Sequence, residues 1–159
     1  MEDSIKSTDD IRSLSEEELT KLAEDGLTNL LRDQGENAKN KLGKLSPENL
    51  DNFFADRKSV RYPTRRIMKS TGMEAGLFGH VEIDPENSDS RLLFLRAELA
   101  ERPELLPRAV AYLIPVINFG EVITDKHCVT YGAHLFGETE EEFYQSICKL
   151  ADWLGSLTP

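Results

Sequence analysis

The hydrophobic positions near the start of the chain follow a helical period. Ser15 and Glu18 form a capping box, because the Ser15 hydroxyl can accept from the Glu18 amide while the Glu18 carboxylate accepts from the Ser15 amide. Behind them, apolar residues recur three and four positions apart, and Gly35 suits the end of the helix. These apolar positions are Leu19, Leu22, Ala23, Leu27, Leu30 and Leu31. The pattern predicts an amphipathic helix that runs from Ser15 to Gly35.

A second helical start lies between Ser46 and Leu50. Ser46 suits the N-cap and Pro47 the first helical position, since proline lacks the amide that a first turn leaves unpaired. The Phe53-Phe54 pair that follows requires a burial site. Further on, Pro63 predicts the start of another short helix, which we expect to end at Gly72.

After Gly72 the period changes from about four to two, which is typical of half-buried strands. The residues from Asp84 to Asp89 are dense in turn formers and separate two such strands. One face carries Leu77, Val81, Ile83, Leu93, Leu95 and Leu99, and the other carries Phe78, His80, Glu82, Phe94, Arg96 and Glu98. The pattern predicts an antiparallel hairpin.

A helix and a second hairpin are predicted next. Pro103 opens a helix whose apolar positions continue to Ile117. The stretch from Phe119 to His127 is interpreted as a strand with a turn, and His127 to Phe136 as its return strand. A second capping box, Thr139 with Glu142, starts a final helix that Gly155 ends.

These elements together predict an α+β fold. Two antiparallel β-hairpins form one sheet packed against helices, and a helical extension precedes them. The expected organisation is a tail over residues 1–12, an N-terminal helical arm over 13–58 and an α+β domain over 59–159.

Composition and charge narrow the class of protein. The 159 residues carry a net charge of -10, a field that repels nucleic acid and anionic membranes at long range. No apolar run approaches the ~18 residues that a membrane span requires. The two cysteines, Cys128 and Cys148, are too few for a disulfide framework in a chain of this length, so we expect a cytoplasmic protein.

Candidate catalytic groups are few. His127 and His134 lie seven positions apart on one predicted strand and would therefore point to opposite faces, so we expect no metal and no cofactor. Cys128 shares a predicted face with His134, but six residues of strand separate them by roughly 20 Å. No phosphate loop, dinucleotide fingerprint or Gly-x-Ser-x-Gly sequence is present. We therefore expect no catalytic residues, and keep a small thiol-dependent enzyme around Cys128 as a third hypothesis.

A basic segment stands out in this acidic chain. It contains six cationic residues and no acidic one: Arg57, Lys58, Arg61, Arg65, Arg66 and Lys69. These side chains could bind phosphate or another anion, with Tyr62 available for stacking. Because the net charge opposes a polyanion, we favour the alternative that they neutralise the protein's own acidic helix starts at Glu16–Glu18 and Glu140–Glu142, which suit the positive end of a helix dipole.

Three phenylalanines suggest a binding surface. Phe78 and Phe94 occupy positions of polar parity on adjacent predicted strands, and Phe136 leaves the apolar face of its own strand. Such a face would be covered by the Phe53-Phe54 segment, by a second subunit or by a client protein. The sequence leaves these alternatives open.

The order of elements resembles a known family. The pieces that carry the likeness are Leu113–Asn118, Val129–Leu135 and the closing helix at Leu150–Leu154, within about residues 63–155. In this order the chain is similar to YbjN-type bacterial sensory-transduction regulators, whose fold is similar to that of type III secretion chaperones. The long N-terminal extension and the basic segment depart from that pattern. The resemblance implies a small, acidic, cytoplasmic and dimeric protein that binds proteins, and it supplies no active site.

The function predicted from all of this is a non-enzymatic protein-interaction module, chaperone-like or regulatory. It would bind a protein partner through the outer sheet face at Phe78, Phe94 and Phe136, and we expect a homodimer. The alternative is a regulator that binds an anion or nucleic acid through Arg57–Lys69, although the net charge disfavours nucleic acid.

Overall fold

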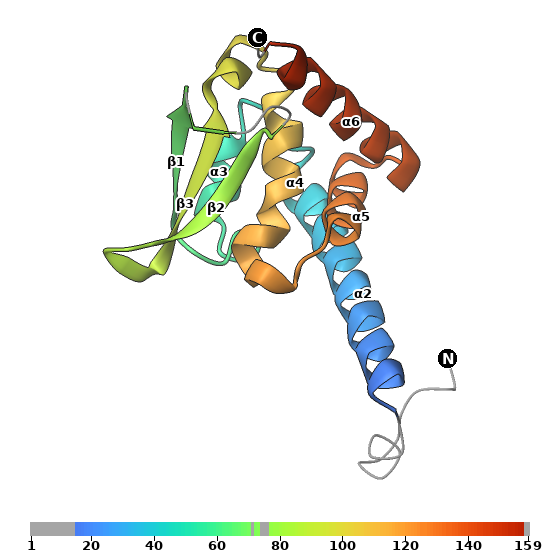
Figure 1. Cartoon of the computed structure of the whole chain (residues 1–159). Helices are drawn as coiled ribbons and strands as arrows, with labels where there is room; N and C mark the ends of the chain where they lie inside the picture. Colours follow the sequence, from blue (N-terminus) through green and yellow to red (C-terminus); the bar gives the residue numbers. More distant parts are fainter. Residues whose placement is uncertain (1–14, 71, 74–76, 158–159) are drawn as a thin grey trace.

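The computed structural model describes residues 15–70, 72–73 and 77–157. The longer elements in chain order are α2 (Glu16–Leu42), α3 (Leu50–Ala55), β1 (Thr64–Lys69), β2 (Gly79–Asp84), β3 (Asn87–Arg96), α4 (Leu106–Phe119), α5 (Asp125–Phe136) and α6 (Glu140–Ser156). Short 3-10 helices at Ala97–Glu101 and Gly120–Val122 flank α4. Helices and one small sheet are mixed, which confirms the α+β class (Figure 1).

The sheet has three strands in the order β1-β3-β2. β2 and β3 form the predicted antiparallel hairpin, with His80 opposite Phe94 and Val81 opposite Leu93. β1 pairs with the other edge of β3 in parallel, and Ile67 lies opposite Phe94. The predicted second hairpin contributes nothing to this sheet, so that part of the predicted fold is wrong.

The strand β1 replaces the short helix predicted after Pro63. Its partner β3 is a distant segment, and the Pro63 carbonyl accepts from the Arg91 amide where the two strands meet. A local start signal at a proline cannot reveal a parallel pairing with a strand that follows later in the chain. The extended form is therefore decided by the hydrogen bonds to β3.

The segment predicted as the second hairpin is helical. Phe119 ends α4, and α5 follows from Asp125, where the Thr124 amide donates to His127 Nδ1 at 3.0 Å. Every residue from His127 to Ala133 is buried, because α2, α4 and α6 pack around α5. A helix that is buried on all sides has no amphipathic period. The β-branched and aromatic residues of this stretch then favour a strand interpretation.

The helix α2 begins as predicted and ends later. In the capping box the Glu18 amide donates to the Ser15 hydroxyl, and the Ser15 amide donates to the Glu18 carboxylate, each at 3.1 Å. The helix then passes Gly35 and stops at Gly43, whose positive φ of 82° is readily adopted by glycine alone among the residues. A Cβ at Gly35 would lie 2.7 Å from the Tyr131 carbonyl oxygen, so Gly35 permits close contact with α5.

The two other predicted helix starts have different outcomes. α6 has its predicted capping box, with the Glu142 amide donating to the Thr139 hydroxyl at 3.1 Å, and it passes Gly155 to end at Ser156. α3 begins later than its proline suggested, because the Ser46 amide donates to Asn49 Oδ1 at 2.7 Å and this turn precedes the helix. The Phe53-Phe54 pair of α3 is buried as expected.

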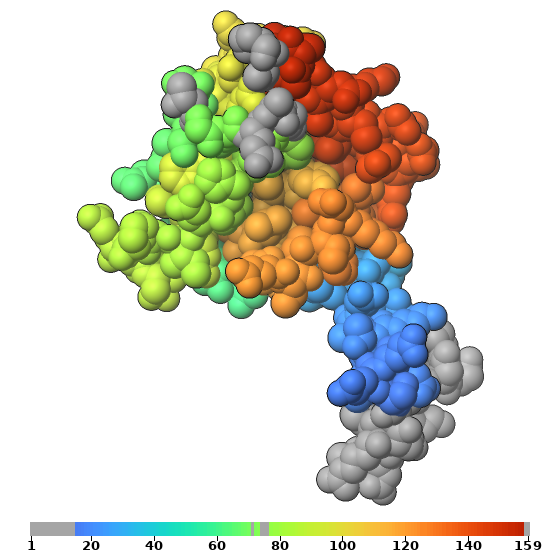
Figure 2. Space-filling view, viewed as in Figure 1, coloured from blue at the N-terminus to red at the C-terminus, as the bar shows by residue number. Residues whose placement is uncertain are grey.

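One hydrophobic core joins the N-terminal helices to the rest. Leu31 of α2, Phe53 of α3, Leu93 of β3, Tyr131 of α5 and Leu154 of α6 belong to the same buried cluster. The boundary predicted at residue 58 therefore does not separate two cores. The segment that stands apart is the first half of α2, where every residue from 15 to 26 is exposed (Figure 2).

Candidate interaction surface

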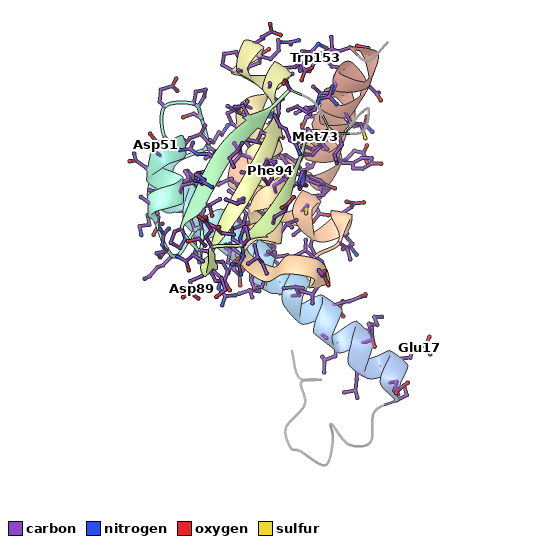
Figure 3. The ribbon with its side chains drawn as sticks, turned by 60° about the vertical axis from the view of Figure 1, so that its left-hand side comes forward. Glu17, Asp51, Met73, Asp89, Phe94 and Trp153 are labelled. Carbon is purple, nitrogen blue, oxygen red and sulfur yellow. The ribbon has the colours of Figure 1, made fainter. Side chains whose placement is uncertain are left out.

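The two faces of the sheet differ in what covers them. On the inner face, a Cβ at Gly79 would lie 2.8 Å from a methyl carbon of Leu113, so α4 packs closely there. Leu93 and Leu95 point to the same side and are almost fully buried. Phe94 lies near the middle of the sheet in Figure 3, on the opposite face, which no described helix covers. We call this opposite face the outer face.

The register defines which side chains share the outer face. Residues directly opposite one another on paired strands point to the same side. Ile67, Phe94 and His80 therefore form one row across β1, β3 and β2. The neighbouring rows are Arg65, Leu92 and Glu82 on one side, and Lys69 and Arg96 on the other.

Phe94 is the aromatic centre of this face and is half-buried. The His80 ring stacks on it with centroids 4.9 Å apart, and the Lys69 ammonium lies 5.2 Å from its centroid. His80 Nε2 is 2.8 Å from a Glu82 carboxylate oxygen. An ammonium near an aromatic ring is a weakly stabilising cation–π contact that leaves the cation accessible.

The other two predicted surface phenylalanines are buried. Phe78 precedes β2, so strand alternation does not place it, and its ring packs edge-on against Tyr112 of α4 at 5.4 Å. Phe136 ends a helix rather than a strand, and it stacks on Phe143 of α6 at 5.9 Å. Of the three phenylalanines predicted to form an exposed surface, Phe94 is the one that lies on the outer face.

Half of the basic segment is used inside the fold. Arg57 donates to the Phe54 carbonyl at 2.7 Å, and Arg61 donates to the Asn118 carbonyl at 3.1 Å. Arg66 pairs with Asp51 and lies over the Phe54 ring. Within the part of the chain that the structure describes, these arginines form none of the predicted ion pairs with Glu16–Glu18 or Glu140–Glu142.

The remaining cations of the segment do not form one patch. Arg65 and Lys69 are two positions from Ile67 on either side and share its outer face, whereas Lys58 lies in the turn after α3. Strand alternation turns Arg66 to the inner side. The cations that are consecutive in the sequence therefore have different locations in the structure. Some make contacts inside the fold, and others lie on the outer face.

A cleft of about 650 Å³ lies between β2, β3 and the C-terminal end of α4. Its walls include Val81, Ile83 and Ile123, together with the two arginines Arg61 and Arg91. The Arg91 guanidinium lies 3.8 Å and the Arg61 guanidinium 5.6 Å from the Tyr62 ring centroid. Sequence reasoning included Arg61 in its basic segment and missed Arg91, because Arg91 arrives from β3 through tertiary structure.

The candidate thiol chemistry finds no support in the geometry. Cys128 is buried, and this desolvation raises the pKa of its thiol to about 12, so a thiolate is disfavoured at neutral pH. The histidines His127 and His134 lie on a helix rather than a strand, about two turns apart. His134 Nδ1 is 2.7 Å from a Glu36 carboxylate oxygen, whereas His127 caps its own helix. Within the described ranges, no three histidine, cysteine or acidic side chains converge as a metal site requires.

Comparison with known proteins gives no match to any family model, curated protein or solved structure. The resemblance to YbjN-type regulators stays a prediction, and the helical segment from Phe119 to Phe136 departs from the element order on which it was based. None of the helices that the structure describes combines the length and apolar composition of a membrane span.

Proposed function

We propose that this chain is a protein-interaction module, regulatory or chaperone-like, that binds a partner through the outer sheet face. The observation that carries the proposal is the row of Ile67, Phe94 and His80, which crosses all three strands on the face that none of the described helices covers. On this face Leu92 and Arg96 are buried and Phe94 is half-buried. A half-buried phenylalanine at the centre of a sheet face that no described helix covers is typical of a surface that a partner completes.

The charges around this row define the chemistry of the partner. Arg65 and Lys69 flank Ile67 on the outer face, and the Lys69 ammonium lies 5.2 Å from the Phe94 ring centroid. The carboxylate of Glu82, on the same face, lies 2.8 Å from His80 Nε2. A partner segment that places an apolar side chain on Phe94 and carboxylates beside Arg65 and Lys69 would be complementary. We therefore expect an acidic segment with at least one exposed apolar residue.

Replacing Phe94 tests this proposal. The immobilised chain would be used to retain proteins from a bacterial extract, and the affinity of one purified retained protein would then be measured. Burying a phenylalanine is worth about 1.5–3 kcal/mol, so Phe94→Ser should weaken that affinity roughly ten- to hundredfold. Tyr144→Ser is the matched control, because Tyr144 is a 48% exposed aromatic residue on α6. Equal affinities for the two variants would contradict the proposal.

A second function, binding of a small anion, is favoured by one observation. Two guanidinium groups from distant segments, Arg61 and Arg91, line the same partly apolar cleft beside Tyr62. An aryl or alkyl carboxylate would place its charge near them and its apolar part on Val81 and Ile83. Arg91→Gln should then abolish a calorimetric signal for benzoate or octanoate. Retention of that signal would exclude the cleft as its source.

A further inference from the structure

The first half of α2 is a helix with an apolar face and no partner within the described part of the chain. Leu19, Leu22 and Leu30 are 37%, 48% and 43% exposed. The N-terminal part of α2 extends away from the rest of the structure, which we call the body (Figures 1 and 2). An isolated helix of this length is marginal in water. An exposed leucine face on such a helix points to a second surface that covers it.

The spacing of this face is that of a coiled-coil seam. Counting from the start of the helix, the seam positions are Glu16, Leu19, Ala23, Gly26, Leu30 and Asp33, separated alternately by three and four residues. This alternation is the a/d repeat of paired helices. Leu22 flanks the seam on one side and widens it, whereas Leu27 on the other side is half-buried and packs against the core of its own chain.

The seam reads the same in both directions. Its centre lies between Glu24 and Asp25, and a two-fold axis there places Leu19 opposite Leu30 of a second copy and Ala23 opposite Gly26. Each such layer joins an a position to a d position, which is the layer geometry of antiparallel helices. An isologous contact requires this self-complementarity.

Gly26 supports close contact at that centre. Glycine inside a helix lowers helix stability by about 1 kcal/mol relative to alanine. A glycine at such a position therefore calls for a structural reason. Among the described residues of one copy, a Cβ at Gly26 would meet nothing within 4 Å, so no contact there requires a glycine. Ala23 and Gly26 together would let two helix backbones approach closely where they cross.

Charge favours the antiparallel direction. A parallel pair would bring the Glu16–Glu18 clusters of both copies side by side, whereas an antiparallel pair separates them by the length of the segment. It also puts the two bodies at opposite ends of the paired helices. One unfavourable contact remains, since Glu16 of each copy would lie beside Asp33 of the other.

We propose that the segment Glu16–Leu30 pairs with the same segment of a second copy, as an antiparallel helix pair through Leu19, Ala23, Gly26 and Leu30. This surface lies apart from the outer sheet face, so the proposal is independent of the function proposed above.

The unfavourable contact between Glu16 and Asp33 provides a test, because removing it should strengthen the dimer. Glu16→Lys places an ammonium beside Asp33 of the partner copy and should tighten the dimer about tenfold. Glu17→Lys makes the same charge change in the same first turn but on the opposite side of the helix, so its effect should be clearly smaller. Sedimentation of the full chain across the micromolar to submillimolar range measures both. A chain that stays monomeric throughout, or equal effects of the two variants, would overturn the proposal.

Disulfide formation tests the direction. In a full chain carrying Cys148→Ser, Leu19→Cys with Leu30→Cys should cross-link into a covalent dimer under mild oxidation, because the two positions face each other across copies. Leu19→Cys alone should not, since the two copies of position 19 would lie about 16 Å apart along the axis. Efficient cross-linking of the single variant would show a parallel pair instead and overturn the proposal.

Discussion

The two halves of α2 belong to one continuous helix and are stabilised by different contacts. From Leu31 onward the helix packs on α5, with Leu31 fully buried and Gly35 in contact with the Tyr131 backbone. From Glu16 to Gly26 every residue is exposed and the helix relies on its own capping box, and Leu27 is the first residue that packs against the core. Leucines at the same helical spacing therefore have different surroundings in the two halves. In one half they pack in the core, and in the other they are exposed.

The largest difference between the halves should come from leucine truncation. Leu31→Ala should lower the free energy of unfolding by about 2–5 kcal/mol, because it leaves a cavity between α2 and α5. Leu22→Ala should cost less than about 1 kcal/mol in dilute solution, where its side chain is 48% exposed. Urea unfolding followed by circular dichroism measures both. Equal losses would show that the first half also packs on the body.

The same substitution at two glycines should have opposite signs. Gly35→Ala places a methyl group 2.7 Å from the Tyr131 carbonyl oxygen, and overpacking of this kind typically costs about 1–3 kcal/mol. In dilute solution, where the chain is monomeric, Gly26→Ala adds a methyl group in open space and should raise helix stability by up to about 1 kcal/mol. Thermal unfolding of the two variants beside the parent chain provides the measurement. A loss at both positions would contradict the assignment of Gly26 to an uncovered face.

Acid should affect the stability of the body and of the first half of α2 through different carboxylates. In the body, Arg108 donates to both carboxylate oxygens of Glu138, at 3.0 and 2.5 Å, and these hydrogen bonds hold the pKa of Glu138 below its ordinary value of 4.5. Its stabilisation is therefore complete above pH 4.5 and is lost as the pH falls through the lower folded-state pKa. Glu138→Gln should cost about 1–2 kcal/mol at neutral pH, with part of the charged contact weakened by solvent.

The pH dependence supplies the check on that prediction. Below the folded-state pKa the parent chain and Glu138→Gln should unfold at the same urea concentration. Arg108→Gln should remove the same pH dependence, because it takes away the cation. A difference between parent and Glu138→Gln that persists unchanged in acid would refute the role of this ion pair.

The smallest expected effect on stability comes from the N-terminal cap of α2. Hydrogen bonds from the Ser15 amide and hydroxyl lower the pKa of Glu18, so acid should fray the first turn as Glu18 takes up a proton. Ser15→Ala should slightly reduce helicity and speed hydrogen exchange in the first half of α2 alone. The urea midpoint of the body should stay unchanged. A shifted midpoint would show that the two halves unfold together.

Local signals were sufficient where neighbours in sequence make the contact. The capping boxes at Ser15 and Thr139 and the hairpin that pairs Val81 with Leu93 depend on residues within a short stretch of chain. In the candidate surface, sequence alternation placed Phe94 on the outer face for the same reason. It failed for Phe78, which precedes the strand and turns toward Tyr112.

Tertiary structure decided the remainder. The segment from Asp125 to Phe136 is helical because three helices bury it from all sides, and that burial removed the period from which a helix would be predicted. β1 is extended because β3 supplies its hydrogen bonds in parallel. The sequence alone determined where α2 and α6 begin and that β2 and β3 pair, since these depend on local hydrogen bonds. It could not determine contacts between distant segments, because the free energy of those contacts comes from surfaces that exist only once the chain has folded.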